Sequence, residues 1–234
     1  MPATLYLVPN LLSDTDASRA LPVYNAEILK DLKYYIVETP KNARLLLKKY
    51  GLKTPFDDIS FYILNEHTKG NEIDEIIAPL YAGNSMGIIS DAGYPAIADP
   101  GEIIIRLAHQ RNIRVVPLSG PNSIFLALAA SGMNSEQFTF HGYLPVKQPD
   151  RSKKIKELEE TTLKTGYTQI FIETPYRNQS MISDLVKTVH PNTLICIAAD
   201  INSDKEMIQT KTAANWQKLK PDFNKKPVVF LIGK

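Results

Sequence analysis

The chain has 234 residues, of which 44% are hydrophobic and 22% are charged, a composition typical of soluble globular proteins with one or two domains. One cysteine and four scattered histidines exclude an internal disulfide and a multi-cysteine or paired-histidine zinc site, so we predict no metal. No apolar run approaches the roughly 20 residues of a membrane span, and the N-terminal stretch lacks the basic segment that begins a signal peptide. We therefore expect a cytoplasmic protein that makes no membrane contact.

The formal net charge of +2 does not by itself indicate a nucleic-acid partner. Residues 1–118 carry 12 basic and 14 acidic side chains, a net of −2, whereas residues 119–234 carry 15 and 11, a net of +4. Solvated helix faces explain such a mild excess as well as an RNA-binding surface does, so both interpretations stay open.

In the first half of the chain, short β-branched or aromatic runs alternate with longer segments of helical spacing. The predicted strands lie at 4–8, 35–37, 60–64, 86–89 and 115–118, and the predicted helices at 41–50, 71–82 and 102–110. Strands that alternate with helices form parallel sheets through right-handed crossovers. Residues 1–118 are therefore predicted to form one doubly wound α/β domain with a mostly parallel sheet.

The second half has a different pattern, with closely spaced strands near its end. A helix of small residues is predicted at 123–130, followed by strands at 138–143, 168–172, 194–198, 205–210 and 228–232 and helices at 151–164 and 178–189. This order favours a second α/β domain with a mixed sheet, at 119–234. The boundary is predicted at the turn-rich Ser-Gly-Pro-Asn stretch, 119–122.

The tripeptide Glu-Thr-Pro occurs twice, at 38–40 and 173–175, each time between a predicted strand and a predicted helix. Each threonine suits an N-cap and each proline suits the first helical position, where a missing N–H costs nothing. This capping chemistry does not require the preceding glutamates. They lie at the carboxyl ends of strands, where open α/β sheets place ligands, so we take Glu38 and Glu173 as candidate catalytic residues.

Glycines concentrate in the middle of the chain, with none before Gly51 and seven of the eleven between Gly83 and Gly142. The core of this region is a buried strand that leads into the loop Ser-Asp-Ala-Gly-Tyr-Pro-Ala-Ile-Ala-Asp-Pro-Gly, at 90–101. Small residues at a strand's carboxyl end let a ligand approach the backbone. The pattern is neither a dinucleotide fingerprint nor a P-loop. It indicates a small-molecule site, with a tight structural loop as the alternative.

Five segments together resemble the tetrapyrrole methylase family of S-adenosylmethionine-dependent methyltransferases. They read TLYLVP (4–9), SDAGYPAIADPG (90–101), VPLSGPNSIFLALAASG (116–132), FTFHGYLP (138–145) and FIETPYRN (171–178), in the family's order and spacing. They are most similar to the branch that methylates a ribose 2′-hydroxyl of small-subunit ribosomal RNA. The run at 90–101 is specific to that branch.

The resemblance implies two α/β domains with S-adenosyl-L-methionine in the cleft between them, and a homodimer. It also implies ribosomal RNA or the small ribosomal subunit as the partner. The implied cofactor-binding residues are Asp91, Ala92, Gly93, Tyr94, Ile97, Asn122, Ser123, Ile172, Ala198 and Ala199.

The acceptor half of the family pattern is altered here. The loop at 9–13 lacks the family's glycine, the stretch at 38–41 reads Glu-Thr-Pro-Lys in place of an acidic-Asp-Thr-Arg motif, and Ala-Asp-Ile-Asn at 199–202 has lost an arginine. Two alternatives to an rRNA methyltransferase therefore stay open. One is a methylase of a tetrapyrrole or other small molecule, and the other is an RNA-binding module that has lost catalysis.

Methylation of a hydroxyl gains from a base that takes its proton. Asp91 and His67 are candidates for that base beside the two glutamates, although each also suits a structural or solvated loop role. For RNA, a phosphate-facing patch beside Tyr143 is predicted from the basic segment Lys147, Arg151, Lys153, Lys154 and Lys156. An exposed amphipathic helix is the alternative for this segment.

Overall fold

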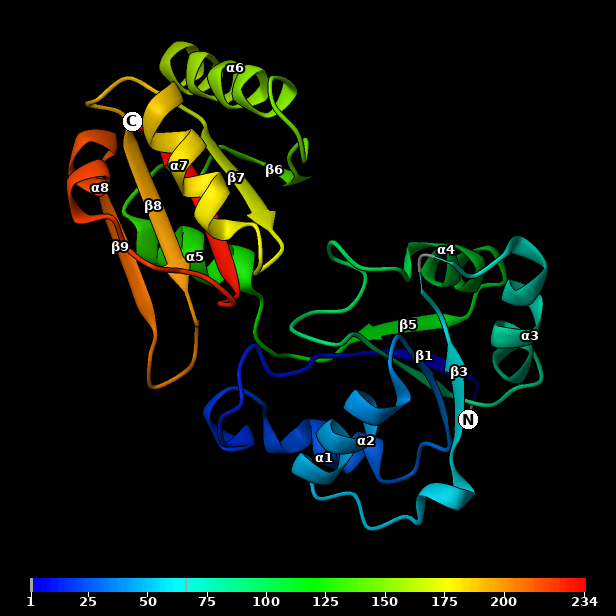
Figure 1. Cartoon of the computed structure of the whole chain (residues 1–234). Coiled ribbons are helices and arrows are strands. Elements are labelled where there is room, and N and C mark those ends of the chain that lie inside the picture. Colours follow the sequence, from blue (N-terminus) through cyan, green and yellow to red (C-terminus); the bar gives the residue numbers. More distant parts are fainter. Residues whose placement is uncertain (1, 66) are drawn as a thin grey trace. The chain divides into compact units, whose positions relative to one another are not determined.

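The computed structural model describes residues 2–65 and 67–234. The chain forms two compact units, the first ending at Asn122 and the second comprising Ser123–Lys234 (Figure 1). Each unit has its own five-stranded sheet. The predicted fold class, two α/β domains of which the second has a mixed sheet, is confirmed.

The first unit alternates strands and helices as the sequence pattern predicts. Its elements are β1 (Thr4–Val8), α1 (Val23–Leu29), β2 (Tyr34–Val37), α2 (Pro40–Lys49), β3 (Ser60–Ile63), α3 (Gly70–Tyr81), β4 (Met86–Ile89), α4 (Glu102–Gln110) and β5 (Arg114–Pro117). All the strand pairs are parallel, in the order β3-β2-β4-β1-β5. The helix α1 was not predicted, because it has seven residues of which only Asn25 and Leu29 are buried, too short for a periodic pattern.

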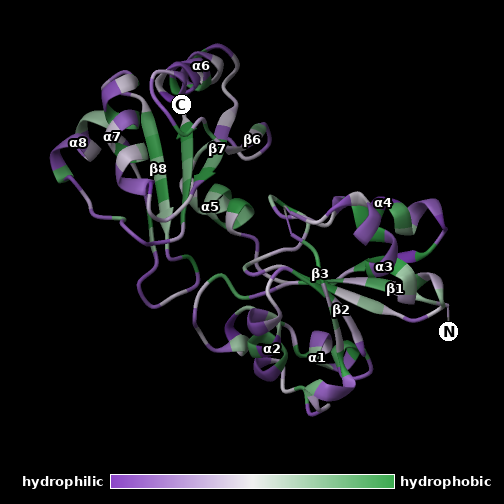
Figure 2. Ribbon diagram, turned by 45° about the vertical axis from the view of Figure 1, so that its right-hand side comes forward, coloured by the Kyte–Doolittle hydropathy of each residue, from purple (hydrophilic) through white to green (hydrophobic). Residues whose placement is uncertain are grey.

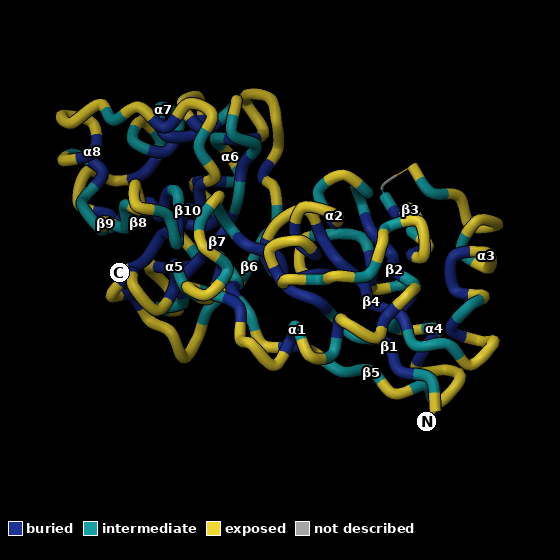
Figure 3. Tube along the Cα trace, turned by 90° about the horizontal axis from the view of Figure 1, so that it is seen from below, coloured by how far each residue is buried: buried dark blue, intermediate teal, exposed yellow. Residues whose placement is uncertain are grey.

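Helices cover both faces of this sheet. Leu29 of α1 and Leu46 of α2 pack in one core cluster, whereas Ile77 of α3 and Ile104 of α4 pack in another, on the other side of the strands. The central strand β4 is buried along its whole length (Figure 3). The neighbours β1 and β4 therefore lead to helices on opposite faces. Their carboxyl ends form the crevice at which open α/β sheets bind ligands.

The second unit packs most of its helices on one face of a mixed sheet. Its elements are α5 (Ser123–Ser131), β6 (Phe138–Tyr143), α6 (Asp150–Thr165), β7 (Thr168–Glu173), α7 (Asn178–Thr188), β8 (Leu194–Ala199), β9 (Met207–Thr212), α8 (Ala213–Leu219) and β10 (Val228–Gly233). The strand order is β6-β7-β10-β8-β9, and only the pair β6–β7 is parallel.

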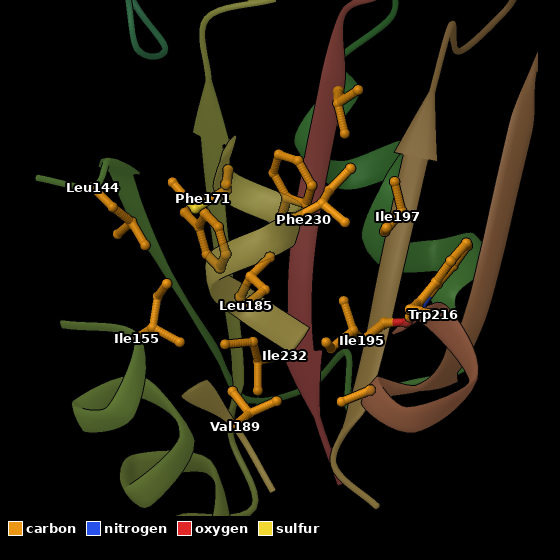
Figure 4. Close-up of a cluster of buried hydrophobic side chains, with 14 of the residues drawn as sticks. Leu144, Ile155, Phe171, Leu185, Val189, Ile195, Ile197, Trp216, Phe230 and Ile232 are labelled. Atoms are coloured by element: carbon orange, nitrogen blue, oxygen red, sulfur yellow. The ribbon is translucent and has the colours of Figure 1, made fainter. Parts of the chain in front are cut away.

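Aromatic residues fill the core beneath α6, α7 and α8. Phe171 of β7 and Phe230 of β10 stack with ring centroids 5.5 Å apart, and Trp216 of α8 donates from Nε1 to the Ile195 carbonyl at 2.9 Å (Figure 4). The remaining helix, α5, is hydrophobic over most of its length and contacts β8, β9 and β10 outside this cluster (Figure 2). The sheet is thus covered on both faces.

The two Glu-Thr-Pro copies differ in structure. In the first copy, α2 begins at Pro40 as predicted, but the hydroxyl of the N-cap residue Thr39 accepts no bond from the helix and donates to Asp91. In the second, the helix begins at Asn178 as its helical pattern predicts, so the expectation that Pro175 is its first residue is wrong. A turn closed by the Arg177 N–H and the Thr174 carbonyl (2.9 Å) comes first, and α7 begins at Asn178.

Near the C-terminus, the strand predicted at 205–210 lies two residues later, as β9, because 201–205 form turns. The short helix α8 follows β9 directly and was not predicted. In both places the sequence passes from a turn to a strand, or from a strand to a helix, without a clear change in the spacing of its apolar residues.

The prediction that Arg151 faces RNA phosphates is wrong. Arg151 is 5% exposed, pairs with Asp184, and donates to the Ser180 hydroxyl at 2.7 Å and the Val146 carbonyl at 3.1 Å. It joins α6 to α7 inside the core. The basic segment also contains four lysines. Lys147, Lys153 and Lys156 are exposed, whereas Lys154 Nζ lies 2.8 Å from Glu157 Oε1.

We predict that Arg151→Ala lowers the free energy of unfolding by about 3–5 kcal/mol, because it leaves the Asp184 carboxylate, whose side chain is only 17% exposed, without its partner. The exposed neighbour Lys153 is the matched control, and Lys153→Ala should change it by less than about 0.5 kcal/mol. Urea unfolding followed by circular dichroism measures both. Equal effects of the two substitutions would refute the structural role of Arg151.

Candidate functional site

Asn10 joins the carboxyl ends of β1 and β4. It is 8% exposed, and its Nδ2 donates to the carbonyl oxygens of Ser90 (3.0 Å) and Asp91 (2.9 Å). Its backbone N–H donates to the Gly93 carbonyl at 2.7 Å. One buried residue therefore fixes the start of the loop 90–101 against the end of the neighbouring strand.

Three carboxylates gather at this edge of the sheet. Glu38 follows β2, and its Oε1 accepts from the Asp91 N–H at 3.0 Å, while the Thr39 hydroxyl donates to Asp91 Oδ2 at 2.7 Å. Asp99 belongs to the same group, because the charges of Glu38 and Asp91 both act on it. The cluster combines the ends of two neighbouring strands and the far end of the loop.

The electrostatics of the cluster favour protonated carboxyls. Burial, first, and then the charge of Glu38 raise the pKa of Asp99 from 3.8 to about 7, with Asp91 adding to the rise and a hydrogen bond from Ser90 opposing it. Burial also raises the pKa of Glu38, reinforced by the Asp91 charge and opposed by the bond from the Asp91 N–H. Asp99 therefore keeps its proton to a higher pH than an ordinary aspartate does and titrates near neutrality, as suits a group that exchanges a proton or meets a cation.

The loop 90–101 has left-handed backbone at Gly93 (φ +70°), Ala96 (+63°), Ala98 (+62°) and Gly101 (+146°). At the two alanines this conformation costs about 1–3 kcal/mol each, and such strain clusters at binding sites. Along the loop, the predicted cofactor residues Asp91, Ala92 and Ile97 are exposed, Tyr94 is half-buried and Gly93 is buried.

A second loop, at 119–122, packs against the end of β1. A side chain at Gly120 would collide with the ring of Pro9. Asn25 Nδ2 donates to the Ser119 carbonyl at 2.8 Å and to the Tyr50 hydroxyl at 3.2 Å, and that hydroxyl donates to the Pro9 carbonyl at 3.1 Å. This buried polar network thus fixes the loop 119–122 against Pro9, the residue that follows β1. The predicted residue Asn122, at the end of the second loop, is half-buried.

In the second unit, the predicted cofactor residues of β7 and β8 lie where these strands end. Val228, at the start of β10, pairs with both Glu173 and Ala199, so the carboxyl ends of β7 and β8 meet there. Ala199 packs in the core beneath α6–α8. Because side chains alternate along a strand, Ile172 and Ala198 face the opposite side, where α5 packs.

The remaining predicted residue, Ser123, begins α5. Met133, just beyond the end of α5, lies against Gly233 at the far end of β10. The helix therefore starts toward the Val228 end. The unit brings Ser123, Ile172 and Ala198 to one end and one face of its sheet.

Glu173 is held by its own turn. Its side chain is fully buried, and Oε1 accepts from the Thr174 N–H at 2.6 Å and from Arg177 Nε and Nη2 at 2.9 and 2.6 Å. Oε2 is buried with no hydrogen-bond partner among the described residues. One oxygen thus has a structural role, and the other is an acceptor without a donor.

The two histidines that the sequence singled out differ in setting. His67 is exposed, in the loop that follows the edge strand β3. His141 Nε2 lies 2.8 Å from Gln169 Oε1, across the pair β6–β7, as a packed strand residue. Within residues 2–65 and 67–234 no group of three or more His, Cys, Asp or Glu side chains could hold a metal ion. None of the described helices is long and apolar enough to cross a membrane.

Sequence reasoning did not select Asn10, Ser90, Asp99 or Arg177 as site residues. Asn10 carries out its role through two backbone carbonyls 80 residues away, which no local pattern signals. Asp99 had a usable signal, since it shares a glycine-rich loop with Asp91. Its high pKa depends on burial, which the sequence does not show.

The fold resembles that of a solved methyltransferase. The crystal structure of the methyltransferase CobJ superposes with a TM-score of 0.63 over 100% of this chain and 95% of the other, at 12% identity. That likeness defines the class of fold as that of a two-domain α/β methyltransferase.

Curated relatives define the family. The chain is 31% identical over 235 residues to ribosomal RNA small subunit methyltransferase I of Pasteurella multocida, covering 97% of this chain and 78% of the relative. Proteins of the same name from Vibrio cholerae and from Buchnera aphidicola subsp. Schizaphis graminum are 30% and 32% identical, covering 88% and 87% of this chain and 67% of each relative. No family model matches the chain. The chain belongs to the family of ribosomal RNA small subunit methyltransferase I.

We predict that Asp99→Asn flattens the pH dependence of stability. A carboxyl whose pKa is about 7 when folded and 3.8 when unfolded binds its proton more tightly in the folded state. Stability is then highest below about pH 4 for this group and falls as the pH rises through about 7. The asparagine variant lacks this loss. Urea midpoints at about pH 5 and about pH 8 measure it, and an identical difference in wild type and variant would contradict the assignment.

Proposed function

We propose that this methyltransferase transfers a methyl group from S-adenosyl-L-methionine to a ribose 2′-hydroxyl of small-subunit ribosomal RNA. The observation that carries the proposal is the match, across 97% of the chain, to a relative named as a ribosomal RNA small subunit methyltransferase. We also infer that the protein is cytoplasmic and homodimeric, and that the domains 1–118 and 119–234 both contribute residues that bind the cofactor.

The residues of the first unit fit this cofactor chemically. S-adenosylmethionine carries a positive sulfonium and an amino-acid ammonium group. The cluster of Glu38, Asp91 and Asp99 would attract either cation, and a cation there would offset the burial and the neighbouring charges that raise the pKa of Asp99. Small residues beside the cluster let a ligand reach the backbone. The sites proposed to bind the cofactor are Asp91, Ala92, Gly93, Tyr94, Ile97, Asn122, Ser123, Ile172, Ala198 and Ala199.

The bound cofactor supplies the electrophilic methyl group, and the protein supplies orientation, exclusion of water and a place for the proton. Glu38 suits the proton better than Glu173 does. Glu38 is half-buried at the end of a parallel strand, and burial raises its pKa. Glu173 is fully buried and bonds Arg177, so its role in the reaction is to fix the turn that follows β7. We propose Glu38 as the general base.

We predict that Glu38→Gln lowers kcat by about 10²- to 10⁴-fold, the range for loss of a general base. The glutamine oxygen still accepts from the Asp91 N–H, so the loop keeps its anchor. The exposed Glu75 of α3 is the matched control, and Glu75→Gln should leave kcat unchanged. Single-turnover methylation with labelled cofactor measures both. A Glu38→Gln enzyme with wild-type kcat would remove Glu38 from the reaction.

We predict that labelled methyl groups enter small-subunit rRNA in an alkali-stable form. Alkaline cleavage of RNA needs the neighbouring 2′-hydroxyl, so a 2′-O-methylated nucleotide remains joined to the next one. The substrate is small ribosomal subunits from a strain that lacks this protein. After alkaline hydrolysis the label should be found in dinucleotides. Label in mononucleotides would indicate methylation of a base.

The two alternative functions have their own signatures in the same assay. Label that enters a porphyrin precursor and not RNA would indicate a small-molecule methylase. Binding of the subunit without cofactor binding by calorimetry, and without transfer, would indicate an RNA-binding module that has lost catalysis.

A further inference from the structure

Tyr176 is the most exposed aromatic side chain among the large hydrophobic residues of the described chain, at 77%. It nevertheless lies on a well-anchored backbone. The Arg177 N–H donates to the Thr174 carbonyl at 2.9 Å, and the Lys225 N–H donates to the Pro175 carbonyl at 3.1 Å. The turn therefore fixes the backbone from which the ring of Tyr176 projects into solvent, an exposure that hydrophobic burial alone would oppose.

A second exposed tyrosine lies at the same edge of the sheet. Tyr143 ends β6, pairs with Ile172 of the parallel neighbour β7, and is 55% exposed. Neighbouring strands are about 4.8 Å apart, and Figure 1 shows the carboxyl ends of β6 and β7 on the same side of the unit. Tyr176 follows the end of β7 by three residues.

Arg177 follows Tyr176 in the chain and lies near Tyr143. Its guanidinium is 36% exposed and is oriented by two bonds to Glu173 Oε1, from Nε at 2.9 Å and Nη2 at 2.6 Å. Glu173, chiefly, and the nearby Tyr143 raise the pKa of Arg177. The edge thus carries two exposed phenol rings and one fixed, planar cation.

The charge around these rings is nearly balanced. Lys147 and Lys225 are exposed nearby, but Asp150 and Asp222 are exposed on the same segments. Lys226 lies 3.5 Å from Asp200. A surface of this kind attracts phosphates weakly. Its distinctive chemistry is the set of flat faces, on which unpaired bases stack whatever their sequence.

We propose that Tyr176 and Tyr143, with Arg177 between them, form a stacking platform for unpaired bases of single-stranded RNA. The inference rests on the proposed function and assigns the RNA-binding role to stacking at the ends of β6 and β7, not to the charged face of α6. Because Ile172 is in the same strand end, the bound strand would pass beside residues proposed to contact the cofactor.

The test uses the full-length protein and a fluorescent oligoadenylate of about 12 nucleotides, within the range that one such site covers. Tyr176→Leu should weaken binding by about 5- to 100-fold, because leucine keeps the apolar surface and loses the flat ring. Tyr176→Phe should bind as wild type does. The slope of log K against log salt should not change, since stacking releases no counterions.

Tyr24, exposed by 61% on α1 of the other unit, is the matched control, and Tyr24→Leu should bind the oligonucleotide normally. The proposal is overturned if Tyr176→Leu binds as wild type, if phenylalanine and leucine weaken binding equally, or if the wild type does not bind the oligonucleotide. Unchanged cofactor binding by Tyr176→Leu confirms that the variant is folded.

A failure of the platform is distinguishable from a failure of the proposed function. If the wild type labels rRNA but Tyr176→Leu has an unchanged KM for small subunits, the platform is wrong and the activity stands. If the wild type labels no rRNA while the oligonucleotide series behaves as expected, the platform stands and the activity is wrong.

Discussion

The partial burial of two carboxyls, Glu38 and Asp99, close to the charge of Asp91 is the constraint on which the candidate site of the first unit depends. The neighbouring strands β2 and β4 lead to helices on opposite faces, and Glu38 and Asp91 follow their carboxyl ends. Asn10 binds two carbonyls at this point, and Thr39 donates to Asp91. These bonds fix the start of the loop 90–101, and with it Asp91, at the ends of the strands. Partly buried carboxyls with raised pKa values are typical of functional sites.

The second unit contributes a different kind of edge. Its sheet brings Ile172, Ala198 and the start of α5 together, all small or apolar, and its one buried acid there is neutralised by Arg177. The acidic edge suits a cationic ligand, whereas the apolar edge with its exposed tyrosines suits flat rings. The two α/β units thus share a class of fold, but one presents carboxylates at the ends of its strands and the other presents apolar and aromatic residues.

The sequence predicted the architecture because strand and helix periods alternate clearly through residue 118. It also located the loop 90–101, because glycine and proline mark it. It did not predict that Arg151 is buried, since a helix of lysines and glutamates resembles a solvated face until the position of α7 is known. Nor did it show that the second Glu-Thr-Pro begins a turn. That difference depends on Arg177 folding back to Glu173, a contact with no counterpart after Glu38. Local sequence patterns thus locate the helices and strands, whereas contacts between these elements decide which side chains of the site are buried or paired.

The most direct test of the central claim, that the carboxylate cluster binds the cationic cofactor, is proton release on binding. Calorimetry at about pH 7 in buffers of different ionisation enthalpy gives the number of protons released. A cation at the cluster lowers the pKa of Asp99 from about 7, so binding should release up to about half a proton. The Asp99→Asn variant corrects for titration of the cofactor's own amino group and should lack this release. Equal proton release by wild type and variant would contradict the account.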